Sequence, residues 1–152
     1  MDKPTVYEQL FSGLDALCAD EPDVIARMAT IACELYHAFD HFDWVGFYRN
    51  IDGQCLKIGP YQGSHGCLVI PFTKGVCGAC ARERRLQHVP DVDAVADHIA
   101  CSSTTRSEVV VPMITETGEL VGVLDIDSNT LDAFDAIDLQ ELPKINRYFE
   151  AP

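Results

Sequence analysis

The sequence predicts an α+β fold in which helices pack on an antiparallel sheet. Three observations support this fold class. Apolar residues recur at helical spacing near the start of the chain, over residues 4–18 and 23–39. The middle of the chain holds β-branched and aromatic stretches separated by short turns, a pattern typical of strands joined by hairpins. The chain closes with an amphipathic stretch over residues 134–149, where Pro143 predicts a bent or broken helix.

The second helix and the first hairpin have the clearest local signals. Pro22 precedes the helix over 23–39, as is common at helix starts. Its apolar positions repeat every three or four residues: Val24, Ile25, Met28, Ile31, Ala32, Leu35 and Phe39. Residues 42–63 then predict a hairpin, with Asp52-Gly53 as its turn and Cys55 on its second strand.

The elements that follow are short, apart from one strand pair. A long loop over 59–67 leads into a short helix that Gly75 opens. Pro112 lacks a backbone N–H, so it marks an edge or a bulge in its strand. The predicted elements are a strand at 68–72, a helix at 75–85, a strand and turn at 86–92, and the strand pair 107–114 and 119–127 joined by residues 115–118.

Length and charge narrow the functional classes. With 152 residues, of which 47% are hydrophobic, residues 1–152 predict a single domain that buries a core without a metal or a disulfide. No stretch reaches the roughly 18 apolar residues of a membrane span, and no basic and apolar leader opens the chain, so we expect a cytoplasmic protein. Its net charge of -13 repels nucleic acid and anionic lipid, so neither is an expected partner.

Two aspartates lie on one face of the last predicted strand. Asp125 and Asp127 alternate with apolar residues, which places their side chains about 7 Å apart. A two-residue turn at Thr117-Gly118 would set Glu108 opposite Asp127, so that three carboxylates share this face. A three-residue turn with a glycine bulge would move Glu108 to the other face, unless Pro112 marks a compensating bulge.

Such a carboxylate cluster has several interpretations. Carboxylates opposed across strands repel one another and raise one another's pKa, so a cation or a bound proton would stabilise them. The cluster therefore predicts a site for a ligand's ammonium group, a site for a divalent metal, or an acid kept protonated for catalysis. The alternative is a solvated strand end without function.

The seven cysteines are many for a reducing compartment, and an odd number cannot form a closed set of disulfides. We interpret Cys18, Cys33 and Cys55 as structural. Cys101 lies in a polar stretch, where a core cysteine is not expected. Cys77 lies at a helix start, whose N–H groups would lower the pKa of its thiol.

Two other interpretations of these cysteines stay open. Cys77-x-x-Cys80 together with His98-x-x-Cys101 has the spacing of a structural zinc site, although a domain of this size folds without one. Cys77-x-x-Cys80 alone has the spacing of a thioredoxin-like redox motif, but no parallel βαβ pattern surrounds it.

Five stretches between about residues 40 and 130 together resemble one enzyme family. They are "DWVGFY", "GPYQG", "GCLVIPFTKGVCGAC", "VPDVDAVADHIACSSTTRSEVVVPM" and "GVLDIDS". Taken together, these five stretches resemble the sequences of the free methionine-(R)-sulfoxide reductases, which are single-domain enzymes of the GAF fold. The resemblance implies a central six-stranded antiparallel sheet flanked by helices, reduction of free methionine-(R)-sulfoxide without a metal or other cofactor, thioredoxin as the reductant, and a homodimer.

The resemblance also implies roles for seven residues. Cys101 matches the attacking thiol, while Cys67 and Cys77 match the thiols that resolve or shuttle the disulfide. Trp44 matches an aromatic residue at the methyl end of the substrate pocket; the carboxylates at its polar end are matched by Glu108, Asp125 and Asp127. Cys80 departs from the family, which has a small residue there, so a Cys77–Cys80 disulfide could compete with the expected one.

The chemistry of a sulfoxide accounts for a reactive thiol in a polar stretch. A thiolate attacks sulfoxide sulfur as the oxygen is protonated, which gives a cysteine sulfenic acid that a second thiol converts to a disulfide. The competing hypothesis is a GAF-type sensor domain that binds a small molecule without catalysis, because a fold alone does not decide function. Release of methionine from its sulfoxide distinguishes the two.

Overall fold

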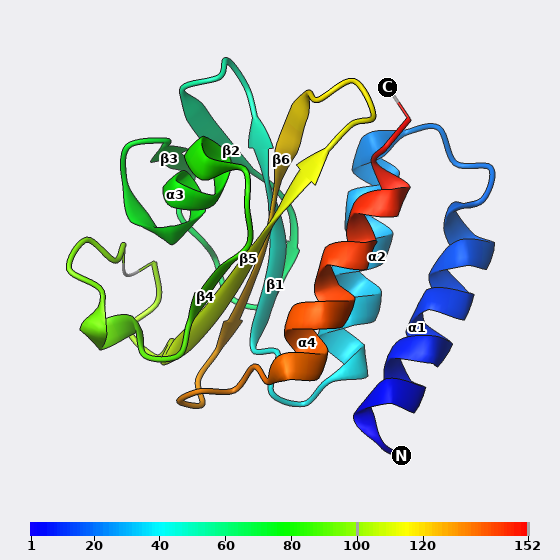
Figure 1. The fold of residues 1–152 in the computed structure, drawn as a ribbon, viewed down its shortest axis with the longest axis horizontal. Coiled ribbons are helices and arrows are strands. Elements are labelled where there is room, and N and C mark those ends of the chain that lie inside the picture. Colours follow the sequence, from blue (N-terminus) through cyan, green and yellow to red (C-terminus); the bar gives the residue numbers. More distant parts are fainter. Residues whose placement is uncertain (100, 152) are drawn as a thin grey trace.

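The computed structural model describes residues 1–99 and 101–151. In this part of the chain, six strands form one sheet in the order β3-β2-β1-β6-β5-β4, and every neighbouring pair is antiparallel (Figure 1). The strands are β1 (Trp44–Asn50), β2 (Cys55–Gln62), β3 (Val69–Pro71), β4 (Gln87–Val89), β5 (Ser107–Ile114) and β6 (Leu120–Ser128). The helices are α1 (Lys3–Cys18), α2 (Val24–Ala38), α3 (Gly75–Glu83) and α4 (Ala136–Glu141), with short 3-10 turns η1 (Val92–Ala94) and η2 (Leu142–Tyr148).

Helices cover both faces of the sheet. Figure 1 shows α1, α2 and α4 on one side and α3 with its neighbouring loops on the other. The first face is the larger core, in which Val109 and Ile126 pack with the helices. Val110 and Val123 point the opposite way and pack with α3. The α+β prediction is confirmed, because helices pack on an antiparallel sheet. Side chains that alternate along each strand form one apolar layer with α1, α2 and α4 and a second with α3.

One boundary expected from the sequence differs in the structure, and another agrees with it. Strand β2 extends to Gln62, so the loop expected over 59–67 begins only at Gly63. The closing helix breaks at Leu142, next to Pro143, as the sequence predicts. No helix among the described residues is both long enough and apolar enough to cross a membrane.

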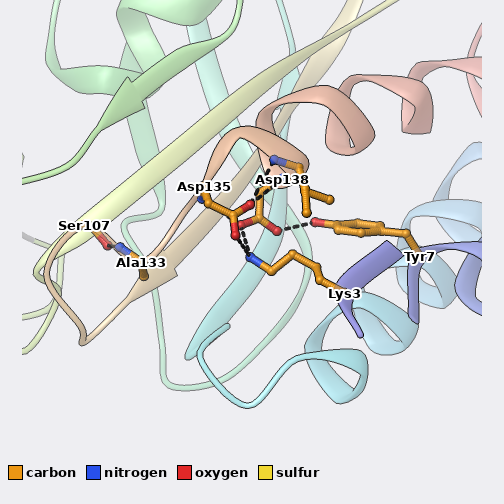
Figure 2. A network of polar contacts seen from close by, with 7 residues as sticks. Lys3, Tyr7, Ser107, Ala133, Asp135 and Asp138 are labelled. Atoms are coloured by element: carbon orange, nitrogen blue, oxygen red, sulfur yellow. Dashed lines mark hydrogen bonds and ion pairs between the residues drawn. The ribbon is translucent and has the colours of Figure 1, made fainter. Parts of the chain in front are cut away.

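A buried ionic network ties the first helix to the last (Figure 2). Asp138 is fully buried, and it accepts hydrogen bonds from Nζ of Lys3 at 2.6 Å and from the hydroxyl of Tyr7 at 2.8 Å. The same side chain accepts from the backbone N–H of Asp135 and completes the capping box of α4. Both carboxylate oxygens of Asp138 thus accept a hydrogen bond from a residue of α1.

We expect Asp138→Ala to lower the free energy of unfolding by about 3 kcal/mol, because it leaves the ammonium of Lys3 and the hydroxyl of Tyr7 without their buried partner. The matched control is Asp15→Ala, which removes an exposed ion pair with Arg147 and should cost about 1 kcal/mol or less. Urea unfolding of the three proteins measures both values. Equal losses of unfolding free energy in the two variants would show that the buried network stabilises the protein no more than an exposed ion pair does.

Candidate active site

The three carboxylates lie on the face of the sheet that α3 covers. Strand β5 pairs with β6 so that Glu108 is opposite Asp127, and β1 pairs with β6 so that Trp44 is opposite the same Asp127. Asp125 is two residues back along β6, on the same face. The prediction that Glu108, Asp125 and Asp127 share one face is therefore confirmed.

The hairpin reaches this register by a different route from a two-residue turn. The N–H of Thr115 bonds to the carbonyl of Glu119, which leaves three residues in the turn, and Gly118 has a φ of 86°. A register shift between Met113 and Ile114 then restores the pairing. Of the two turns that the sequence left open, the structure has the three-residue turn, and the compensating bulge lies next to Pro112, between Met113 and Ile114. Pro112 itself lies beyond the short strand β4, where one side of β5 is unpaired.

Burial keeps the carboxyl groups protonated. Only 5% of Glu108 and 5% of Asp125 is exposed, and Asp127 is half-buried. Burial, then the negative charge of Asp127, raises the pKa of Glu108 to about 8. Burial, then the charge of Glu108, raises the pKa of Asp125 well above its usual range, and burial with the charge of Asp125 does the same for Asp127. Burial in this site therefore favours the protonated form of all three carboxyl groups.

Two of these carboxyls have very different neighbours. Oε2 of Glu108 is 3.2 Å from Nε2 of His98, whose own pKa burial lowers. Oδ1 of Asp125 is buried and has no hydrogen-bond partner in the described part of the protein. Buried polar atoms are nearly always paired, so this oxygen marks the position where a ligand's polar group would bind.

We expect the raised pKa of Glu108 to make stability fall as pH rises from about 4.5 to 8. An unfolded glutamate loses its proton near pH 4.5, whereas folded Glu108 keeps its proton up to about pH 8, so the folded state binds more protons in this window. Glu108→Gln should therefore flatten the pH dependence of the unfolding free energy, by up to about 1.4 kcal/mol per pH unit. Urea unfolding at several pH values measures both slopes. Identical slopes for the two proteins would contradict the shift.

Cys77 is in the first turn of α3 and points toward the carboxyls. Its Sγ is 4.0 Å from Oε1 of Glu108. Burial, then the charges of Asp125 and Glu108, raises the pKa of this thiol well above its ordinary value. The expected lowering by the helix start is wrong, because loss of water and nearby negative charge outweigh the N–H groups. Donor atoms of Cys77, Glu108 and Asp125 lie within 4.8 Å of one another, so these three could hold a cation if they lost their protons.

Cys101 is bonded to Cys67, and their Cα atoms are 5.4 Å apart. This disulfide joins the loop before β3 to the loop before β5. Since Cys101 is engaged in it, the zinc set of Cys77, Cys80, His98 and Cys101 is not assembled. Cys80 is a free, fully buried thiol packed in the core under α3.

Trp44 forms an aromatic wall of the pocket. Its indole N–H donates to the carbonyl of Ser64 at 2.7 Å, and its ring stacks near Tyr48 and Tyr61. A Cβ at Gly46 would collide with the Trp44 ring, so glycine is required between Trp44 and Tyr48. The alternation of these three residues on β1 puts them on the same face of the sheet.

One cavity brings together nearly all the expected residues. Cys101, Cys77, Trp44 and the three carboxylates line it, and Cys67 reaches it through the disulfide; Tyr48, His65, Gly66, Ile70, Gly75, Val76, His98, Ile99, Ser102 and Thr105 complete the lining. Sequence reasoning did not assign Tyr48 or His98 to the site. The alternation in "DWVGFY" was a usable signal for Tyr48, whereas the contact between His98 and Glu108 depends on the loop fold.

Comparison with known proteins decides the family. The family model for the GAF domain matches residues 18–143. The free methionine-R-sulfoxide reductase of Saccharomyces cerevisiae is 34% identical over 95% of this chain and 84% of its own length. The enzyme of the same name from Escherichia coli is 34% identical over 95% of this chain and 87% of its own. The chain belongs to the free methionine-R-sulfoxide reductases of the GAF-domain family.

A solved structure of this reductase family supports the same assignment. The free methionine-R-sulfoxide reductase of Neisseria meningitidis, in complex with its substrate, superposes with a TM-score of 0.92 at 41% identity; the match covers 99% of this chain and 89% of that one. The family resemblance, the six-stranded GAF fold and the expectation of an enzyme are confirmed. A sensor without catalysis is therefore not the preferred interpretation.

Proposed function

We propose that this protein reduces free methionine-(R)-sulfoxide to methionine through a cysteine sulfenic acid and an intramolecular disulfide. The observation that carries the proposal is one cavity lined by Cys101, already bonded to Cys67, and by Glu108 and Asp125, two acids whose pKa burial raises. The named activity of the yeast and Escherichia coli relatives supports the substrate class. Sulfoxide reduction needs such a thiol and such an acid in the same pocket.

In the first step, the thiolate of Cys101 attacks the sulfoxide sulfur while a carboxylic acid protonates the oxygen. The oxygen moves to the Cys101 sulfur, which becomes a sulfenic acid, and methionine leaves with the electron pair on its sulfur. We assign the proton to Asp125, because its buried Oδ1 has no hydrogen-bond partner among the described residues. The two oxygens of Glu108 are already occupied by Cys77 and His98.

In the second step, the thiol of Cys67 attacks the sulfenic sulfur. Water leaves, and the Cys67–Cys101 disulfide forms, which is the pairing the structure holds. A dithiol then reduces the bond and is itself oxidised; we propose thioredoxin in this role. Cys77 is a free thiol that lines the same cavity, which supports a role for it in exchange with this disulfide. A homodimer and a cytoplasmic location stay predictions from the sequence.

Charge accounts for the preference for a free amino acid. The α-ammonium of the substrate would lower the pKa of one carboxyl in the cluster and pair with it, as opposite charges do. A methionine sulfoxide inside a peptide lacks this ammonium. The aromatic wall at Trp44 would contact the methyl end, so that only one sulfoxide epimer directs its oxygen to the acid.

We expect turnover of the free R epimer, and at least about a hundredfold lower kcat/KM for the free S epimer, because the S oxygen points away from the proton donor. The test measures methionine released from each epimer with dithiothreitol as the reductant. An N-acetylated, amidated methionine-(R)-sulfoxide is the matched control for the missing ammonium. Equal turnover of both epimers, or of the blocked compound, would contradict the proposal.

A further inference from the structure

The disulfide adjoins an exposed edge of the sheet. Cys67 lies two residues before β3, which is the outermost strand beyond β2 (Figure 1). The two residues that follow are apolar and exposed: Leu68 is 70% exposed and Val69 is 52% exposed. An edge strand with exposed apolar side chains favours pairing with another chain. Here that edge lies one residue from a bond that must be reduced in every catalytic cycle.

The backbone of this edge has groups available for a partner. The carbonyl of Leu68 accepts from Ile58, and the N–H of Phe72 donates to Gln54, so these groups face β2. In an antiparallel ladder the alternate residue faces the other way, which directs the N–H and C=O of Val69 away from β2. An extended segment of another protein could add there as a further strand.

Positive charge indicates the character of the partner. Lys57 pairs with Val69 across the two strands, and Lys74 follows the end of β3; both side chains are exposed. Among the residues that the structure describes, neither lysine lies within 4.0 Å of a carboxylate. The chain as a whole is strongly acidic, with a net charge of -13, so the two lysines give this edge a local positive charge that would attract a partner with an acidic rim.

We infer that the edge formed by Leu68, Val69, Lys57 and Lys74 is the docking surface for an acidic protein dithiol, and that this reductant attacks the sulfur of Cys67. The inference rests on the proposed function only in taking the disulfide as the bond to be recycled. The partner's thiolate bonds to Cys67, and Cys101 leaves as a thiolate. The partner's second thiol then attacks the mixed disulfide, which frees Cys67 and leaves the partner oxidised by two electrons.

The test uses the oxidised protein alone, so it does not depend on sulfoxide chemistry. Reduced thioredoxin, or dithiothreitol in a parallel series, is mixed with the protein, and loss of the Cys67–Cys101 bond is followed by mass. For Leu68→Asp and for the double variant Lys57→Glu/Lys74→Glu, we expect the thioredoxin rate to fall at least about tenfold, with the dithiothreitol rate unchanged. Ile51→Asp, which changes an exposed apolar residue at the β1–β2 turn, is the matched control.

A thioredoxin that lacks its second cysteine identifies the attacked sulfur. It should form a mixed disulfide with Cys67, found by peptide mass mapping. A mixed disulfide on Cys101, unchanged thioredoxin rates in both variants, or an equal loss of the dithiothreitol rate would overturn the inference. Absence of methionine release from the free sulfoxide would instead refute the proposed function, since that assay is separate.

Discussion

The Cys101→Ser variant should release no methionine from free methionine-(R)-sulfoxide, even in a single turnover. A serine hydroxyl is hardly ionised near neutral pH and is a poor nucleophile toward sulfoxide sulfur. Cys77, which lines the same cavity, does not replace it, because burial and the charges of Asp125 and Glu108 raise the pKa of its thiol. The measurement is methionine released per chain by the reduced protein without added reductant.

The matched controls replace the other two thiols. Cys67→Ser should release up to one methionine per chain and then stop, because resolution follows the chemical step; Cys101 is then a sulfenic acid or is rescued by Cys77. Cys77→Ser should keep the attacking group and be intermediate in repeated turnover. A full burst from Cys101→Ser together with none from Cys77→Ser would make Cys77 the attacking thiol.

Asp125→Asn should lower kcat/KM by a factor of about 10² or more, because an amide cannot supply the proton that the sulfoxide oxygen needs. Asp127→Asn should also lower it, since it removes a charge partner from the polar end of the pocket. Both variants should fold, because an amide relieves the repulsion among buried carboxyls. Steady-state kinetics with dithiothreitol, beside urea unfolding, measure both effects.

Asp20→Asn is the control for these substitutions, because Asp20 is exposed in the turn after α1. It should leave both activity and stability unchanged. Wild-type kinetics in Asp125→Asn and Asp127→Asn would show that neither carboxyl group takes part in the mechanism.

The carboxylate face could be predicted because it depends on local rules. Alternation along one strand places Asp125 and Asp127 together, and pairing with the neighbouring strand adds Glu108. Helix α2 was predictable for a similar reason, because its apolar residues recur at helical spacing along the sequence. Such patterns span only a few residues, over which the regular backbone geometry of a strand or helix determines which side chains share a face.

Features that depend on distant segments could not be predicted in the same way. The raised pKa of Cys77 arises from burial under the sheet and from carboxyls that lie 31 or more residues away in the chain. The contact of His98 with Glu108 and the buried partnership of Lys3 with Asp138 likewise need the folded chain. The sequence left two turns at Gly118 open, because a three-residue turn with a compensating bulge gives the same strand register as a two-residue turn.

The most direct test of the account is to map the disulfides that form when the fully reduced protein receives one equivalent of free methionine-(R)-sulfoxide without any reductant. The account predicts one methionine released per chain and a single new disulfide between Cys67 and Cys101, with Cys77 and Cys80 still alkylated as free thiols. Methionine release accompanied by a Cys77–Cys80 disulfide, with Cys101 still free, would contradict the assignment of the reactive thiol. No release of methionine would contradict the proposed function itself.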